Sequence, residues 1–121
     1  MNALSMVQTA SILLVLTAAG GVGLAMWRFL RKDNPPHWLA MVHGFLAAGT
    51  FTLLFYVLVV EGLEPIITIG VLSLGAAAVG GLVLNLAFHL AGRLLPAWLV
   101  HVHIALGAVG TGLVLWKAWW L

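Results

Sequence analysis

Histidines are the side chains of this sequence best suited to chemistry, because an imidazole can bind a metal ion, carry a proton or hydrogen-bond a ligand. The chain has five of them: His37, His43, His89, His101 and His103. His101 and His103 are two residues apart, which is a rotation of about 200° on a regular helix. These two imidazoles therefore cannot bind one ion together, and one of them must face elsewhere.

A sequence repeat indicates which of His101 and His103 belongs to a shared site. When the residues from Ser11 to Val60 are compared with those sixty positions later, fourteen of the fifty pairs are identical without a gap. The pattern indicates an internal duplication, with repeat 1 over residues 1–60 and repeat 2 over residues 61–121. His103 matches His43, whereas His101 and His89 break the symmetry. Other matched residues are the pairs Gly20 with Gly80, Gly21 with Gly81, Pro36 with Pro96, and Trp38 with Trp98.

Composition determines which elements must position the histidines. Of the 121 residues, 64% are hydrophobic and only 7% are charged, and the mean hydropathy is +1.17. One small soluble core cannot bury this much apolar surface. Four apolar stretches each reach the roughly 20 residues that span a bilayer. They are Ala3 to Leu30, Trp38 to Val60, Ile66 to Leu90 and Trp98 to Leu121.

Backbone groups inside lipid must satisfy their own hydrogen bonds, so each stretch is predicted to be a helix. The connections are short, and neighbouring helices must therefore run antiparallel. We expect an all-α membrane protein with a single domain over residues 1–121. Its fold is a four-transmembrane-helix up-and-down bundle, built from two tandem helical hairpins.

Charged residues predict the orientation and the location. The basic residues Arg28, Arg31, Lys32 and Arg93 fall in the first and third connections, whereas the second connection is acidic. The positive-inside rule places the basic side in the cytoplasm and both termini outside. We expect an integral protein of a bacterial or archaeal cytoplasmic (inner) membrane. The net charge is only +2, so lipids and not nucleic acid are the expected partners.

The repeat places His43 and His103 at equal depth on the second and fourth spans. These spans are expected to be diagonal in the bundle, with axes about 11 to 14 Å apart. We expect this gap to be too wide for direct imidazole contact and suited to a planar haem b, with His43 and His103 as its two iron ligands. The glycine pairs lie at a similar depth, and we expect them to open a slot for the haem edges. These are Gly20 and Gly21, and Gly80 and Gly81.

Other polar residues are assigned to the surroundings of this site. Asn85 and His89 share one helix face with Gly81. Asn85 is expected to form either a structural bond between helices or a bond to a functional histidine. His89, His101 and Asn85 are candidates to hydrogen-bond quinone oxygens, and His37 is expected to be solvated at the interface. The residues available to haem propionates are Arg28, Arg31, Arg93, His37 and His89.

With one histidine on each ligand helix and glycines nearby, the chain resembles the small membrane b-type cytochromes and the haem-bearing four-helix membrane anchors of respiratory dehydrogenases. This resemblance implies a haem iron held between histidines of separate helices and one-electron transport. Quinol or quinone is the expected electron donor or acceptor in the lipid. Because the loops are short and no residues remain for a soluble domain, we expect the chain to work beside redox partner subunits or as a homodimer. Many relatives hold two haems, but all five histidines here lie toward the inner half. The chain is therefore expected to carry one.

Two other readings remain open. One is a structural membrane subunit without a cofactor, in which other helices or water satisfy the histidines. The other is a zinc or copper site made from His43, His89, His101 and His103, since imidazole suits both metals and the four lie at similar depth. Such a site would have to overcome the two-residue spacing of His101 and His103, which turns them to different helix faces on a regular helix. A transporter is disfavoured because no acidic or basic residue lies in mid-membrane to couple an ion. In the haem reading, the chain is expected to act as an electron-transfer protein or redox-complex subunit rather than as a stand-alone enzyme.

Overall fold

A computed structural model describes residues 2–62 and 64–120. Four helices, all long and apolar enough to cross a membrane, make up the described chain. Their bounds are α1 Ala3–Arg31, α2 His37–Glu61, α3 Pro65–Val83 and α4 Ala97–Trp119, with α3 continuing as the π-helix η1 Leu84–His89. The predicted all-α four-helix fold is confirmed, and each predicted span ends within two residues of its helix. Leu121, the last residue of the predicted fourth span, lies outside the described residues.

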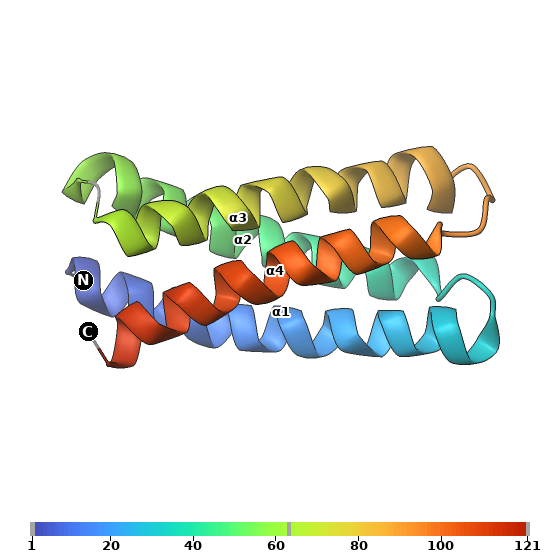
Figure 1. Ribbon diagram of the computed structural model, residues 1–121, viewed down its shortest axis with the longest axis horizontal. Helices are drawn as coiled ribbons and strands as arrows, with labels where there is room; N and C mark the ends of the chain where they lie inside the picture. Colours follow the sequence, from blue (N-terminus) through green and yellow to red (C-terminus); the bar gives the residue numbers. More distant parts are fainter. Residues whose placement is uncertain (1, 63, 121) are drawn as a thin grey trace.

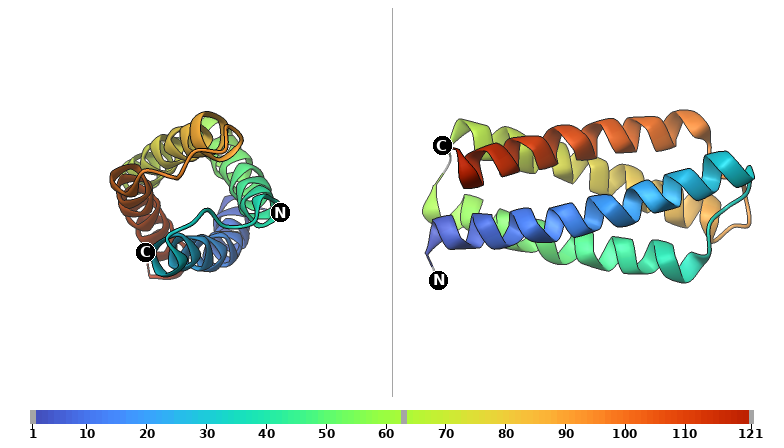
Figure 2. Two further views of the ribbon diagram at one scale, coloured as in Figure 1. Left: turned by 90° about the vertical axis from the view of Figure 1, so that its right-hand side faces the viewer. Right: turned by 90° about the horizontal axis from the view of Figure 1, so that it is seen from below.

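The helices form a square bundle in which sequence neighbours run antiparallel (Figure 1, Figure 2). Around the square the order is α1, α2, α3, α4, so α2 lies diagonally opposite α4, as expected. We call the end with the α1–α2 and α3–α4 connections the inner end, because the connections with most of the basic residues lie there. The end where the two chain termini lie is called the outer end.

The two inner connections repeat one backbone feature. Lys32 follows α1 in the left-handed conformation, with φ 55°, and Gly92 holds the equivalent place after η1, with φ 68°. The next helix begins after Pro36 in one copy and after Pro96 in the other. Proline disfavours helical geometry in the residue before it, so Pro36 and Pro96 keep the connections from becoming helical before α2 and α4 begin.

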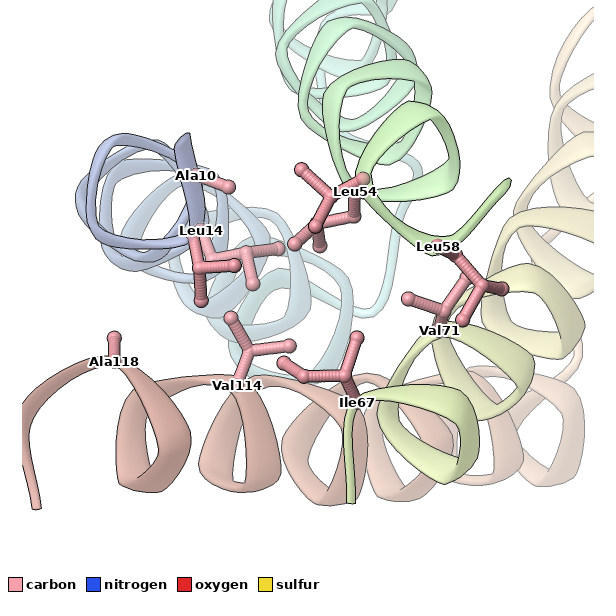
Figure 3. Close-up of a cluster of buried hydrophobic side chains, with 10 residues drawn as sticks. Ala10, Leu14, Leu54, Leu58, Ile67, Val71, Val114 and Ala118 are labelled. Carbon is pink, nitrogen blue, oxygen red and sulfur yellow. The ribbon is translucent and has the colours of Figure 1, made fainter. Parts of the chain in front are cut away.

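The enclosed apolar core lies in the outer half of the bundle (Figure 3). All four helices contribute to it, and Leu54 and Val114 are completely buried. The hydroxyls of Thr50 and Thr52 bond back to carbonyl oxygens of their own helix, as expected for membrane threonines. The core residues are Val7, Ala10, Leu14, Leu54, Val57, Leu58, Ile67, Val71, Val114 and Ala118.

The π-helix η1 is the largest departure from the repeat. Its wider turn is seen in the backbone bonds from Leu90 N to Asn85 O, at 2.9 Å, and from Arg93 N to Phe88 O, at 2.8 Å. The equivalent stretch of the first repeat lies within the regular helix α1. Segments of this kind are rare and often occur at functional sites. Here the segment carries both Asn85 and His89.

Candidate functional site

His43 and His103 face each other in the inner half of the bundle. They come from the diagonal helices α2 and α4, and both side chains are half-buried. The ring centroids are 6.2 Å apart, and the ring planes are inclined at 77°. This distance lies within the range of aromatic pairs. The expectation that the gap excludes direct imidazole contact is therefore wrong, since the rings project from their helices toward each other.

Each of these imidazoles is fixed by a backbone carbonyl of the neighbouring helix. His43 Nδ1 donates to the oxygen of Thr17 at 2.9 Å, and His103 Nδ1 donates to the oxygen of Ala77 at 2.7 Å. The two bonds are equivalent in the repeat, because both partners are shifted by sixty residues. A carbonyl oxygen can only accept, so Nδ1 carries the proton and Nε2 keeps its lone pair.

The two Nε2 atoms are left without a hydrogen-bond partner among the described residues. Every fully buried side-chain nitrogen or oxygen in the described residues has a hydrogen-bond partner. Because the two Nε2 atoms have no such partner, they cannot be fully buried, and each keeps some accessible surface. A neutral imidazole with a free lone pair is able to bind a metal ion.

The glycine pairs lie directly against these imidazoles. A Cβ atom at Gly21 would be 2.9 Å from His43 Cε1, and one at Gly81 would be 3.1 Å from His103 Cε1. At Gly20 and Gly80 the nearest imidazole atoms would be 3.9 Å and 3.8 Å away. We expected these glycines to admit the edges of a haem. The contacts that the structure shows are with the histidine rings, which approach the helix backbone because the glycines have no side chain.

A second polar cluster lies nearer the inner end, between α2 and η1. His37 Nε2 donates to Asn85 Oδ1 at 2.9 Å, and Asn85 Nδ2 donates to Met41 Sδ at 3.7 Å. His89 Nε2 donates to the carbonyl oxygen of Pro35 at 2.9 Å. The His37 and His89 rings are 4.9 Å apart between centroids and inclined at 81°. The expectation that His37 is merely solvated is therefore wrong.

Asn85 does bond to a histidine, but that histidine is His37 and not one of the central pair. His101 stands apart from both clusters, since its side chain is exposed and its ring packs on Phe29 with centroids 4.9 Å apart. Its Nδ1 bonds to the carbonyl oxygen of Ala97, in its own helix, at 2.6 Å. His101 and His103 thus face different surroundings, as their spacing predicts.

The alternative metal site of His43, His89, His101 and His103 finds no support. Within residues 2–62 and 64–120, no three side chains of His, Cys, Asp or Glu are grouped so that they could hold a metal ion. The reason is geometric, because the four histidines belong to three separate groups. That alternative relied on the affinity of imidazole for these metals and on the similar depth of the four histidines, and depth does not determine which way a side chain faces.

The arginines at the inner end contact nearby backbone and aromatic rings. Arg28 Nε donates to the carbonyl oxygen of Leu95 at 2.8 Å, and Arg31 lies over the Trp27 ring at 4.1 Å from its centroid. Arg93 lies over the Phe88 ring at 4.6 Å. These contacts hold the arginine side chains at the inner end of the bundle, where the sequence predicts the basic residues to lie.

Sequence reasoning missed several residues of these sites. The repeat could have pointed to Thr17 and Ala77, but their side chains differ and only their carbonyl groups are used. Nothing in the sequence marked Met41 as a member of the second polar cluster. Comparison with protein-family models, with curated proteins and with solved structures finds no match to this chain.

Proposed function

We propose that this protein is a membrane b-type cytochrome in which His43 and His103 bind the iron of one haem b. The distance between the two rings carries the proposal. An imidazole nitrogen lies about 1.2 Å from its ring centroid and binds a metal at about 2.0 Å, so two ligands on opposite sides of one metal have centroids about 6.4 Å apart. The separation of the two rings is 6.2 Å.

The bonds to Nδ1 give independent support. A metal-binding histidine usually donates its other ring N–H to a carbonyl or carboxylate group, which orients the ring and increases its basicity. Both imidazoles have such a donor bond, to Thr17 and to Ala77. The backbone thus holds both rings with Nε2 free to bind a metal.

The difference in packing between the two halves also supports a flat group between α2 and α4. Fully enclosed apolar side chains gather in the outer half, whereas the imidazoles and the glycines around them are only half-buried. Arg28 and Arg93 place positive charge at the inner end, which favours haem carboxylates on that side. When bound, the haem supplies one-electron redox chemistry, and two histidine ligands leave its iron no open position for a substrate.

The proposal also covers the redox partners and the membrane in which the protein lies. Quinol in the bilayer is the proposed electron donor, or quinone the acceptor, and a redox subunit or a second copy of the chain is the proposed protein partner. The protein resides in the cytoplasmic membrane of a bacterium or archaeon, with the inner end in the cytoplasm and both termini outside. The positions of Arg28, Arg31, Lys32 and Arg93 support this orientation through the positive-inside rule.

Optical spectroscopy of the purified full-length chain tests the proposal. We expect a Soret band and a sharp α-band on reduction, with one haem per chain. His43→Ala or His103→Ala should abolish this low-spin spectrum, while His37→Ala and His101→Ala should preserve it. A colourless protein from haem-supplied cells contradicts the proposal, and so does a spectrum that survives both of the first two substitutions.

A second candidate function is that of a structural subunit. The 6.2 Å separation also fits a direct edge-to-face contact, which contributes about 0.5 to 1.5 kcal/mol. In that case the chain is purified folded, colourless and free of metal. The His43→Ala substitution then lowers the thermal midpoint without changing any absorption band.

A further inference from the structure

The cluster of His37, Met41, Asn85 and His89 is present on one side of the bundle only. The residues sixty positions away from its members are Ala97 and His101 on α4, and Ala25 and Phe29 on α1. The side with the cluster also contains the π-helix η1, which the first repeat lacks. The central histidine pair is symmetric and does not need these residues. The asymmetric cluster therefore requires a separate explanation.

The ring nitrogens of this cluster are arranged like those of metal ligands. His37 donates its Nε2–H to the Asn85 side chain, and His89 donates its Nε2–H to the carbonyl of Pro35. Each ring consequently has its proton on Nε2 and a lone pair on Nδ1. This is the usual arrangement around a metal site, where an amide or carbonyl oxygen orients the ligand histidine.

The spacing of the two rings fits a bent pair of ligands. With about 3.2 Å from the metal to each centroid, two imidazoles at a tetrahedral angle have centroids about 5.2 Å apart. His37 and His89 are 4.9 Å apart, well below the separation of about 6.4 Å expected for ligands on opposite sides of a metal. The two histidine pairs of this protein thus match different coordination geometries.

Met41 supplies a third donor atom. It lies four residues after His37 on α2, and side chains with this spacing share one helix face. Its sulfur accepts from the same Asn85 amide that binds His37. Thioether sulfur selects soft metals such as Cu(I), and imidazole also binds copper. Zinc favours cysteine, histidine and carboxylate ligands, and the cluster has neither cysteine nor carboxylate.

We propose that His37, Met41 and His89 form a Cu(I)-binding site near the inner end of the bundle. Asn85 and the Pro35 carbonyl orient the two imidazoles toward the metal. The site uses neither His43 nor His103, so it goes beyond the haem proposal and does not depend on it.

A competition titration tests the site. The full-length chain, purified without a histidine tag, is titrated with Cu(I) against the coloured chelator bicinchoninate under reducing conditions. We expect one Cu(I) per chain. His37→Ala and Met41→Leu should each weaken binding by more than about 100-fold, and Asn85→Ala by about 10- to 100-fold because it only orients a ligand. His101→Ala is the matched control and should bind as the unchanged chain does.

Leucine has a similar volume to methionine, so Met41→Leu keeps the packing and removes only the sulfur. X-ray absorption of the copper-loaded chain should show a sulfur neighbour that Met41→Leu abolishes. The proposal is overturned if the unchanged chain takes no copper from the chelator, or if Met41→Leu binds equally well. The double variant with His43→Ala and His103→Ala should retain the site. If this double variant lost copper binding, the metal would lie at the central pair and the proposed site would be overturned. The haem proposal is tested separately, by the absorption spectrum.

Discussion

The outer and inner halves of the bundle are built from the same four helices but are held together differently. In the outer half, apolar side chains from all four helices enclose one another. In the inner half, imidazoles bond to backbone carbonyls and asparagine side chains link separate segments. Packing thus stabilises the bundle at the outer end, which leaves the inner half free to carry polar groups that are costly in a membrane.

The inner half itself contains two kinds of histidine. His43 and His103 obey the repeat, each with an equivalent carbonyl and an equivalent glycine pair. His37 and His89 belong to a cluster between α2 and η1 that has no counterpart at the symmetry-related place between α4 and α1. A site on the bundle axis can take the same residue from both repeats, whereas a site between α2 and η1 takes non-equivalent residues from the two repeats and need not follow the symmetry.

The largest expected effect comes from filling the space beside a central imidazole. A methyl group at Gly21 would lie 2.9 Å from His43 Cε1, so Gly21→Ala must displace the ring. If the proposed haem is bound, its content should fall by more than about tenfold, which corresponds to about 1.4 kcal/mol of binding free energy. The ratio of Soret absorbance to protein absorbance measures it. Gly23→Ala is the control, because a Cβ there meets no atom within 4 Å.

Filling space in the outer half should lower the stability of the fold and leave binding of the proposed haem unchanged. A Cβ at Gly110 would lie 2.6 Å from Leu74 Cγ and 2.9 Å from the carbonyl oxygen of Gly70. We expect Gly110→Ala to lower the free energy of unfolding by about 1 to 3 kcal/mol. Thermal unfolding in detergent, followed by circular dichroism, measures this. Gly112→Ala has open space around it and serves as the control. Loss of haem from a folded Gly110→Ala protein would contradict the division between the halves.

A smaller effect is expected where the two inner connections meet. The Asn34 amide donates to the carbonyl oxygen of Arg93 at 2.8 Å, and its Oδ1 accepts from the Leu95 N–H at 3.0 Å. Asn34→Ala removes both bonds and should cost about 1 to 2 kcal/mol of stability. Asn34→Asp keeps the acceptor and loses the donor, so its thermal midpoint should lie between those of Asn34→Ala and the unchanged chain. Equal midpoints for all three proteins would show that the connections are not joined through this side chain.

The smallest expected effect compares the two repeats at one backbone position. Lys32 and Gly92 both have positive φ, a conformation that glycine adopts without strain. Gly92→Ala should destabilise by about 1 kcal/mol, and Lys32→Gly should stabilise by a few tenths of a kcal/mol. The two changes should shift the thermal midpoint in opposite directions. A shift in the same direction would mean that the connections differ in more than this residue.

Much of the architecture could be predicted without coordinates. The length and composition of the apolar stretches are sufficient for four spans, because a bilayer requires about 20 apolar residues and a helical backbone. Short connections dictate the antiparallel order, and α2 lies diagonal to α4 as expected. The sixty-residue repeat also singled out His43 and His103, because equal positions in two hairpins of the same orientation have equal depth.

Only the tertiary structure decided what those side chains contact. Helix rotation and the small distances between helices determine that Gly21 and Gly81 admit imidazoles and that Thr17 and Ala77 supply carbonyls. The widened turn of η1 accompanies the meeting of Asn85 with His37, and the periodicity of a regular helix does not reveal it. Sequence determines depth through the length of an apolar run, but which way a side chain faces depends on neighbours distant in the chain.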